Sequence, residues 1–145
     1  MNIFTYGSLM IRNIFISAAG RNFKSQDADL SGYGRFCLKN DIYPGIIISN
    51  NDITNGIVYF DVNDVSVRNL DMFEGDYYQR TPVRVTLGDQ SIVDAETYVI
   101  KNAYRHILSS EKWSFEDFKN KFQDEFRRKY FGFEAVSGKD RDCCA

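Results

Sequence analysis

The sequence predicts an α+β domain, built as a small, mixed, twisted β-barrel with a few flanking helices. About six segments are rich in the β-branched and aromatic residues that pleated sheets favour, and few show helical periodicity. Short loops containing Gly, Asn and Asp join most of these segments, which is the spacing of antiparallel hairpins. A sheet made mainly of hairpins, with little helix to cover it, is expected to twist and curl into a barrel.

The first segment is a short strand that leads into a helix. Residues 3–6 carry β-branched and aromatic side chains, and Gly7-Ser8 then breaks the strand. Apolar residues recur every three or four positions over residues 10–19, which predicts an amphipathic helix that ends at Gly20. A strand that ends in Gly-Ser before a helix leaves backbone N–H groups without internal partners. Such groups favour an anion or a polarised carbonyl.

Three strands are expected between residues 30 and 62. Residues 30–38 form the first, bent by two internal glycines. A turn over residues 41–45 leads to a short strand over residues 45–49. Asn50-Asn51-Asp52 then turns the chain again, before a strand over residues 53–62.

A helix that ends at Glu74 is predicted next. Asn63 or Asp64 is its expected N-cap, and Gly75 suits the position just past its last turn. Glu74 then lies at the negative end of the helix dipole, where the pKa of a carboxylate is raised. This is an unfavourable position for a glutamate with a purely structural role.

A hairpin and a final helix complete the predicted domain. Strands over residues 77–87 and 92–100 flank a Gly-Asp-Gln-Ser loop, and residues 102–110 are expected to be irregular. Ser114 caps the last helix, whose apolar stripe is typical of core packing. The stripe consists of Phe115, Phe118, Phe122 and Phe126.

Length and composition indicate one domain and exclude several functions. The 145 residues are 43% hydrophobic and 15% aromatic, so we expect one domain over residues 1–132 and a flexible tail over residues 133–145. A net charge of -2 and a pI of about 5.4 favour neither nucleic acid nor anionic membranes. No apolar run approaches the roughly 20 residues of a transmembrane helix, and no signal segment is evident. We expect a cytoplasmic monomer.

The sequence offers little for metal or nucleophilic catalysis. His106 is the single histidine and there is no Cys-x-x-Cys, so we expect no metal ion and no other cofactor. A triad would need His106 as its base and Ser8 or Cys37 as nucleophile, and nothing in the sequence orients them. Cys37 is expected to be a buried structural residue. Cys143 and Cys144 are expected to be free thiols in the tail.

Two motifs carry a family resemblance over residues 1–130. One is Tyr-Gly-Ser-Leu at residues 6–9, and the other is Leu-Asp-x-Phe-Glu-Gly-x-x-Tyr-x-Arg-x-x-Val at residues 70–83. Together, in this order, they resemble the gamma-glutamylcyclotransferase-like superfamily. The similarity is closest to the branch of gamma-glutamylamine cyclotransferase and the plant avirulence-induced proteins. That resemblance implies a small β-barrel flanked by helices, in agreement with the pattern of strands.

The resemblance also implies roles for individual residues. Glu74 matches the catalytic acid/base of the superfamily. Its substrate-binding loop matches the four residues Tyr6, Gly7, Ser8 and Leu9. We expect Tyr78 and Arg80 to buttress the cavity. A tyrosine from a later strand contacts substrate in some relatives, and Tyr98 and Tyr104 are both candidates.

The implied activity is that of a γ-glutamyl cyclotransferase. The α-amine of a γ-glutamyl amine or peptide attacks its own γ-carbonyl, closing 5-oxoproline and releasing a free amine. The leaving amine stays open, because the glutathione-specific branch also carries Tyr-Gly-Ser-Leu while the second motif indicates the γ-glutamylamine branch. Two alternatives are a non-catalytic binding module for a γ-glutamyl or similar small metabolite, and a γ-glutamyl amide hydrolase.

Overall fold

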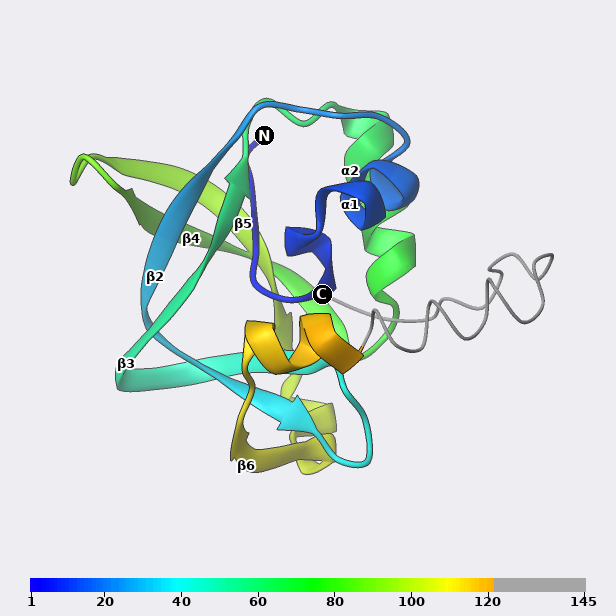
Figure 1. The fold of residues 1–145 in the computed structure, drawn as a ribbon, viewed down its shortest axis with the longest axis vertical. Coiled ribbons are helices and arrows are strands. Elements are labelled where there is room, and N and C mark those ends of the chain that lie inside the picture. The colour runs from blue at the N-terminus through cyan, green and yellow to red at the C-terminus, as the bar shows by residue number, and fades with distance from the viewer. Residues whose placement is uncertain (122–145) are drawn as a thin grey trace, which may run out of the picture.

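The strands pair into one six-stranded sheet that closes into a barrel. In the computed structural model, which describes residues 1–121, the strand order is β3-β1-β5-β4-β2-β6, and β2 also pairs with β3. That pairing closes a ring of five strands and leaves β6 outside it (Figure 1). The strands run over Ile3–Thr5 (β1), Ser25–Leu38 (β2), Pro44–Tyr59 (β3), Tyr78–Leu87 (β4), Ile92–Ile100 (β5) and Leu108–Lys112 (β6). The predicted small, mixed, closed sheet is confirmed.

Strand β1 is the shortest of the ring and is buried along its whole length. It pairs antiparallel with β3 on one side and parallel with β5 on the other, where Ile3 lies beside Glu96. All three of its residues are buried, because both neighbouring strands and the barrel interior surround it. Whatever follows β1 in the chain therefore starts from a rigid, central position.

Strands β2 and β3 form one long hairpin, which corrects two of the sequence expectations. Residues 50–52 do not turn the chain, because they lie inside β3, which runs without a break over Pro44–Tyr59. The pairing shifts from Ser31 with Ile53 to Tyr33 with Ile48, so the extra residues of β3 are absorbed in a bulge opposite Gly32. Strand β2 also begins at Ser25, earlier than expected, because its exposed polar residues there hide the apolar pattern of a strand.

Helices α1, Arg12–Ala19, and α2, Asp64–Glu74, lie side by side against the barrel (Figure 1). The C-cap of α1 is Gly20 with φ +96°, as a left-handed end requires. The N-cap of α2 is Asn63, whose Oδ1 accepts from the Ser66 N–H at 2.8 Å. The Ser66 hydroxyl in turn donates to the Ala19 carbonyl at 2.8 Å, so the two helices are joined where one ends and the other begins.

The region expected to be irregular contains a 3-10 helix, Asn102–Ile107 (η2), and the strand β6. Strand β6 pairs with the second half of β2, beyond the part that pairs with β4, and this long-range partner is what the local pattern did not indicate. A helix then begins at Phe115, with Ser114 Oγ accepting from the Asp117 N–H at 3.2 Å, as predicted. Phe122, Phe126, Cys143, Cys144 and the predicted tail lie outside the described residues.

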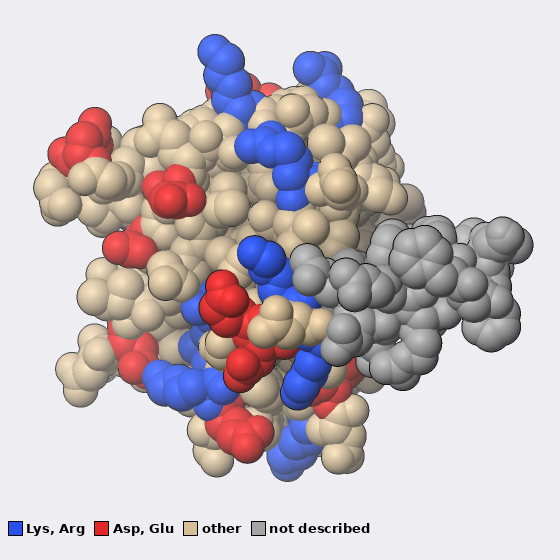
Figure 2. Space-filling model, viewed as in Figure 1, with Lys and Arg blue, Asp and Glu red and all other residues tan. Residues whose placement is uncertain are grey.

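The surface is of mixed charge on the face seen in Figure 2, where acidic and basic side chains alternate and gather in its lower half.

Cys37, which was expected to be buried, is half-buried, and burial raises the pKa of its thiol. No helix within residues 1–121 is long and apolar enough to cross a membrane.

Candidate active site

The loop after β1 is built from buried residues. Tyr6, Ser8 and Leu9 are each at most 2% exposed, and Gly7 is buried as well. Gly7 interrupts the strand, and a 3-10 turn, Ser8–Met10 (η1), follows it before α1. The Gly7 carbonyl accepts from the Met10 N–H at 2.9 Å, so residues 7–10 form a hydrogen-bonded turn. The predicted break at Gly7-Ser8 is therefore confirmed.

Side chains of the barrel hold this loop by its backbone and by Tyr6. The Tyr6 hydroxyl donates to the Tyr98 carbonyl in β5 at 2.6 Å. The Tyr59 hydroxyl, from β3, donates to the Leu9 carbonyl at 3.0 Å, and burial raises the pKa of Tyr59 to about 12. Because the side chain of Tyr6 is tied into the barrel, a ligand on this loop would meet mainly its backbone.

Glu74 is the last residue of α2 and is only 4% exposed. Few glutamates in proteins are buried to this degree. Gly75 directly follows, with φ +84°, and ends the helix as predicted. Burial is the largest cause that raises the pKa of the Tyr98 phenol, and the hydrogen bond to Asp71 adds to it. The negative charge of Glu74 raises the pKa of Tyr98 by a smaller amount.

An ion-pair network fixes α2 against the β4–β5 hairpin. Arg80 in β4 donates from Nε and Nη2 to both carboxylate oxygens of Asp71, at 3.0 and 3.2 Å. It also donates from Nη1 to Glu96 at 2.6 Å. The Tyr98 hydroxyl completes the network by donating to Asp71 Oδ1 at 2.7 Å. Asp71 precedes Glu74 by three residues on α2, so the network acts on the end of the helix that carries Glu74.

The network contains residues that the sequence arguments did not assign. The sequence indicates no role for Asp71 or Glu96, although Asp71 belongs to the second motif and its spacing from Glu74 puts both on one helix face. Glu96 had no local signal, because its partner comes from the neighbouring strand. Tyr78 donates to the Pro44 carbonyl at 2.7 Å and so ties β4 to the start of β3, which supports a buttressing role.

The two candidate tyrosines occupy different positions. Tyr98 is 3% exposed and touches both the Glu74 side of α2 and the Tyr6 side of the loop. Tyr104 lies on η2, with its ring 4.9 Å from that of Tyr77 and 6.4 Å from that of His106. The geometry therefore favours Tyr98 as the tyrosine associated with Glu74.

The alternative nucleophilic sites are not assembled within residues 1–121. His106 is exposed on η2, and no hydrogen bond joins it to Ser8 or Cys37 in that part of the chain. The Cys37 thiol instead donates to the Lys112 carbonyl at 3.7 Å. No group of three or more His, Cys, Asp or Glu residues among those described is arranged to hold a metal ion.

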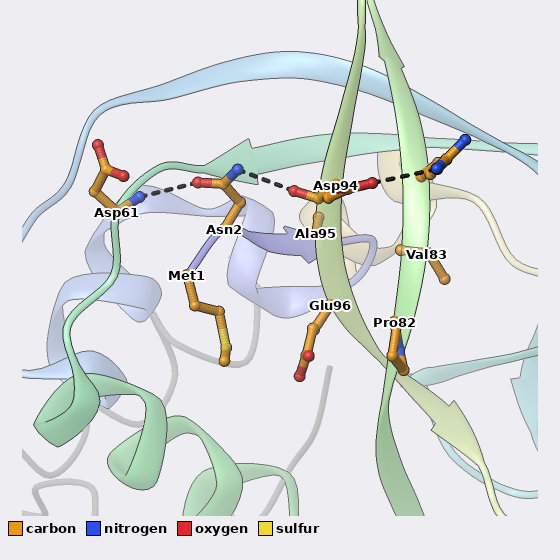
Figure 3. A pocket seen from close by; sticks show the side chains of 9 residues that line it. Met1, Asn2, Asp61, Pro82, Val83, Asp94, Ala95 and Glu96 are labelled. Atoms are coloured by element: carbon orange, nitrogen blue, oxygen red, sulfur yellow. Dashed lines mark hydrogen bonds and ion pairs between the residues drawn. The ribbon is translucent and has the colours of Figure 1, made fainter.

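A surface hollow lies next to the ion-pair network, at the start of β1 (Figure 3). Its lining residues are Met1, Asn2, Asp61, Pro82, Val83, Arg84, Asp94, Ala95 and Glu96. The Asn2 amide bridges this hollow, accepting from the Asp61 N–H at 3.1 Å and donating to the Asp94 carbonyl at 2.9 Å. Neither Glu74 nor any residue of the Tyr6–Leu9 loop lines it, so we do not assign the substrate to it.

Comparisons with known proteins agree with this description. Residues 3–115 match the family model described as "Gamma-glutamyl cyclotransferase, AIG2-like". Protein AIG2 C of Arabidopsis thaliana is 35% identical over 132 residues, covering 88% of this chain and 79% of that protein. AIG2-like protein C of the same plant is 35% identical over 126 residues, covering 86% of this chain and 73% of its own length.

Solved structures share the fold. A solution structure of a protein from Arabidopsis thaliana superimposes with a TM-score of 0.70 at 29% identity, over 99% of this chain and 94% of that one. The structure of a gamma-glutamyl cyclotransferase superimposes with a TM-score of 0.66 at 16% identity, over 96% and 89% of the two chains. A glutathione-specific cyclotransferase from yeast superimposes with a TM-score of 0.61 at 11% identity. The last two likenesses concern the fold alone.

Proposed function

Because the chain belongs to the gamma-glutamyl cyclotransferase, AIG2-like family, we propose that it converts a γ-glutamyl amine or peptide into 5-oxoproline and a free amine. The observation that carries the proposal is the position of Glu74. This carboxyl group is 4% exposed at the end of α2, and Asp71 on the same helix accepts a hydrogen bond from Tyr98, whose carbonyl holds the Tyr6 hydroxyl. A buried carboxyl group is suited to proton transfer on a bound polar substrate.

The proposed reaction uses the substrate's own α-amine as the nucleophile. This amine attacks the γ-carbonyl carbon, a new C–N bond closes the five-membered lactam, and the bond to the leaving amine breaks. Both reacting groups belong to one molecule, so the protein's main task is to fold the substrate. Correct orientation of this kind supplies about 7–11 kcal/mol in favourable cases.

Glu74 would transfer the proton in this reaction. It accepts a proton from the attacking amine and gives it to the departing amine, so that one carboxyl group serves both steps and ends in its starting state. General acid–base catalysis of this kind typically contributes about 10²–10⁴-fold. Asp71 and Arg80 do not exchange protons with the substrate in this scheme. Their ion pair keeps the end of α2 in place.

The loop of Tyr6, Gly7, Ser8 and Leu9 would bind the substrate through backbone N–H groups. Donors fixed in a buried loop stabilise a carboxylate or a developing oxyanion without having to reorganise. Gly7 has no side chain that would separate a ligand from the backbone. The carbonyls of Tyr6 and Leu9 are held by Arg35 and Tyr59, which supports a rigid loop.

A substrate screen tests the proposal. Purified protein is incubated with a γ-glutamyl amine, a γ-glutamyl dipeptide and glutathione, and 5-oxoproline is quantified by mass spectrometry. We expect 5-oxoproline from at least one compound, and the compound turned over fastest identifies the leaving group. Absence of product from all three, with one of them bound in calorimetry, would support the non-catalytic binding module instead.

A further inference from the structure

Arg35 is a half-buried arginine of β2 that reaches the backbone of the Tyr6–Leu9 loop. Its Nη1 donates to the Tyr6 carbonyl and to the Asn55 carbonyl, both at 2.9 Å, and its Nη2 donates to Asn55 Oδ1 at 2.8 Å. Burial lowers its pKa to about 10, so it still carries its charge near neutral pH. Neither motif of the sequence includes Arg35, because its partners lie far along the chain, at Tyr6 after β1 and at Asn55 in β3.

The charge of Arg35 is not neutralised by an acidic partner in the described part of the chain. All the hydrogen bonds of its guanidinium go to carbonyl or amide oxygens, and none of the ion pairs formed within residues 1–121 includes it. The ring of Trp113 covers it instead, with the guanidinium carbon 5.0 Å from the ring centroid. A partly desolvated cation without a counter-ion is costly, and a well-packed neutral side chain would serve stability better.

The peptide between Tyr6 and Gly7 turns this contact into an effect on the loop. No cis peptide bond is present among the described residues, and in a trans peptide the C=O and the next N–H point in opposite directions. A donor that fixes the Tyr6 carbonyl therefore also fixes the direction of the Gly7 N–H. Because that donor is charged, it polarises the peptide and strengthens the Gly7 N–H as a hydrogen-bond donor.

We propose that Arg35 is a positioning residue for the substrate loop, acting through the Tyr6 carbonyl to orient and polarise the Gly7 N–H. The inference rests on the proposed function, since it assumes that this loop holds an anionic or polarised group of the substrate. Arg35 makes no proton transfer in this role. Its charge, which no acidic side chain within residues 1–121 pairs with, gives the loop a positive potential that suits a carboxylate or an oxyanion.

Three variants test the role of Arg35. Arg35→Met removes the charge and the donors but keeps an unbranched side chain that packs under Trp113. Arg35→Lys keeps the charge but replaces the planar fork of donors by one ammonium group. The matched control is Arg12→Met, because Arg12 also donates to neighbouring side chains, at Asn22 and Ser25, but to no carbonyl of the loop.

Turnover of the best γ-glutamyl substrate is measured at a temperature where circular dichroism shows every variant to be folded. We expect kcat/KM to fall at least tenfold in Arg35→Met, to fall less in Arg35→Lys, and to stay within twofold of wild type in Arg12→Met. The spectroscopic readout is the Gly7 amide resonance of ¹⁵N-labelled protein. It should move upfield in Arg35→Met, because the peptide loses its polarising charge, and it should not move in Arg12→Met.

Unchanged kcat/KM in Arg35→Met, or an unmoved Gly7 resonance, would overturn the proposal. If Arg35→Met does not fold, Asn55→Ala replaces it, because it removes one acceptor of Arg35 and keeps the cation. A smaller shift of the Gly7 resonance in the same direction supports the proposal, and no shift overturns it. If the wild-type protein turns over no γ-glutamyl compound, the proposed function fails, and the Gly7 resonance alone decides whether Arg35 controls the loop.

Discussion

The Tyr98 hydroxyl donates a hydrogen bond of 2.7 Å to Asp71, which precedes Glu74 by three residues on α2. The backbone carbonyl of Tyr98 accepts a hydrogen bond of 2.6 Å from Tyr6, at the start of the Tyr6–Leu9 loop. One residue of β5 thus contacts both the helix that carries Glu74 and the loop that follows β1. The distance between Glu74 and the loop therefore depends on how firmly Tyr98 is held.

We expect Tyr98→Phe to lower kcat about tenfold, with a smaller change in KM. The variant keeps the ring and removes only the hydroxyl, so Asp71 loses one donor while Arg80 still holds it. The free energy of unfolding should fall by about 1 kcal/mol, as for the loss of one typical hydrogen bond. Steady-state kinetics and urea denaturation measure the two effects.

The control for this prediction is Tyr33→Phe. Tyr33 is a half-buried tyrosine of β2 whose hydroxyl makes no hydrogen bond within residues 1–121. The Tyr33→Phe variant should keep both kcat and the free energy of unfolding close to their wild-type values. Equal kcat in the two variants would show that the contact between Tyr98 and Asp71 does not position Glu74.

We expect Glu74→Gln to abolish turnover while the fold and ligand binding persist. Glutamine has nearly the shape of glutamate but cannot accept and return a proton, so kcat should fall by about 10²–10⁴-fold. The melting temperature should change by only a few degrees, because glutamine fills the same buried space. Asp94→Asn, at an exposed carboxylate of β5, is the control and should keep wild-type kcat. Turnover within a few-fold of wild type in Glu74→Gln would remove Glu74 from the mechanism.

Local sequence signals predicted the parts of the fold that depend on neighbours along the chain. The strand before Gly7, the end of α2 at Gly75 and the β4–β5 hairpin are all encoded by residues within a few positions of one another. The placement of Glu74 at a helix end followed from the same kind of signal. Its burial did not, because burial depends on which elements pack against α2.

The features that sequence arguments missed depend on partners far along the chain. Strand β3 continues through residues 50–52 because β2 pairs on both sides of the bulge, although Asn-Asn-Asp is a typical turn sequence. Strand β6 forms because β2 offers it an edge, and it brings Trp113 over Arg35. Arg35 gains its role from distant partners, the Tyr6 carbonyl after β1 and Asn55 in β3, and nothing in its local sequence distinguishes it from a surface arginine.

We expect Gly56→Ala to destabilise the barrel where β3 meets β1. A Cβ atom at this position would collide with the backbone oxygen of Thr5, which cannot move aside as a flexible side chain can. The free energy of unfolding should fall by about 1–3 kcal/mol, as in other overpacked cores. Gly88→Ala is the matched control, because a Cβ there meets nothing within 4 Å. Equal urea midpoints for the two variants would contradict the close contact between β1 and β3.

The last prediction distinguishes cyclisation from hydrolysis. Cyclisation uses the substrate's own α-amine, so water does not enter the product, whereas hydrolysis consumes water and yields free glutamate. In ¹⁸O-labelled water we expect 5-oxoproline without the heavy label. Acid hydrolysis of the same substrate in the same water is the positive control, because it must give labelled glutamate.

A blocked substrate gives the second test of the same mechanism. We expect the N-acetylated form of the best γ-glutamyl substrate to give no product, because an amide nitrogen is a poor nucleophile and cannot close the lactam. If Glu74 serves only to move a proton between two nitrogens, it has no role to play once the attacking nitrogen is blocked. A hydrolase would still cleave the acetylated compound, since water attacks the γ-carbonyl whatever the α-amine carries. Release of the amine from that compound, or labelled glutamate from the parent substrate, would rule out the lactam mechanism and favour a γ-glutamyl amide hydrolase.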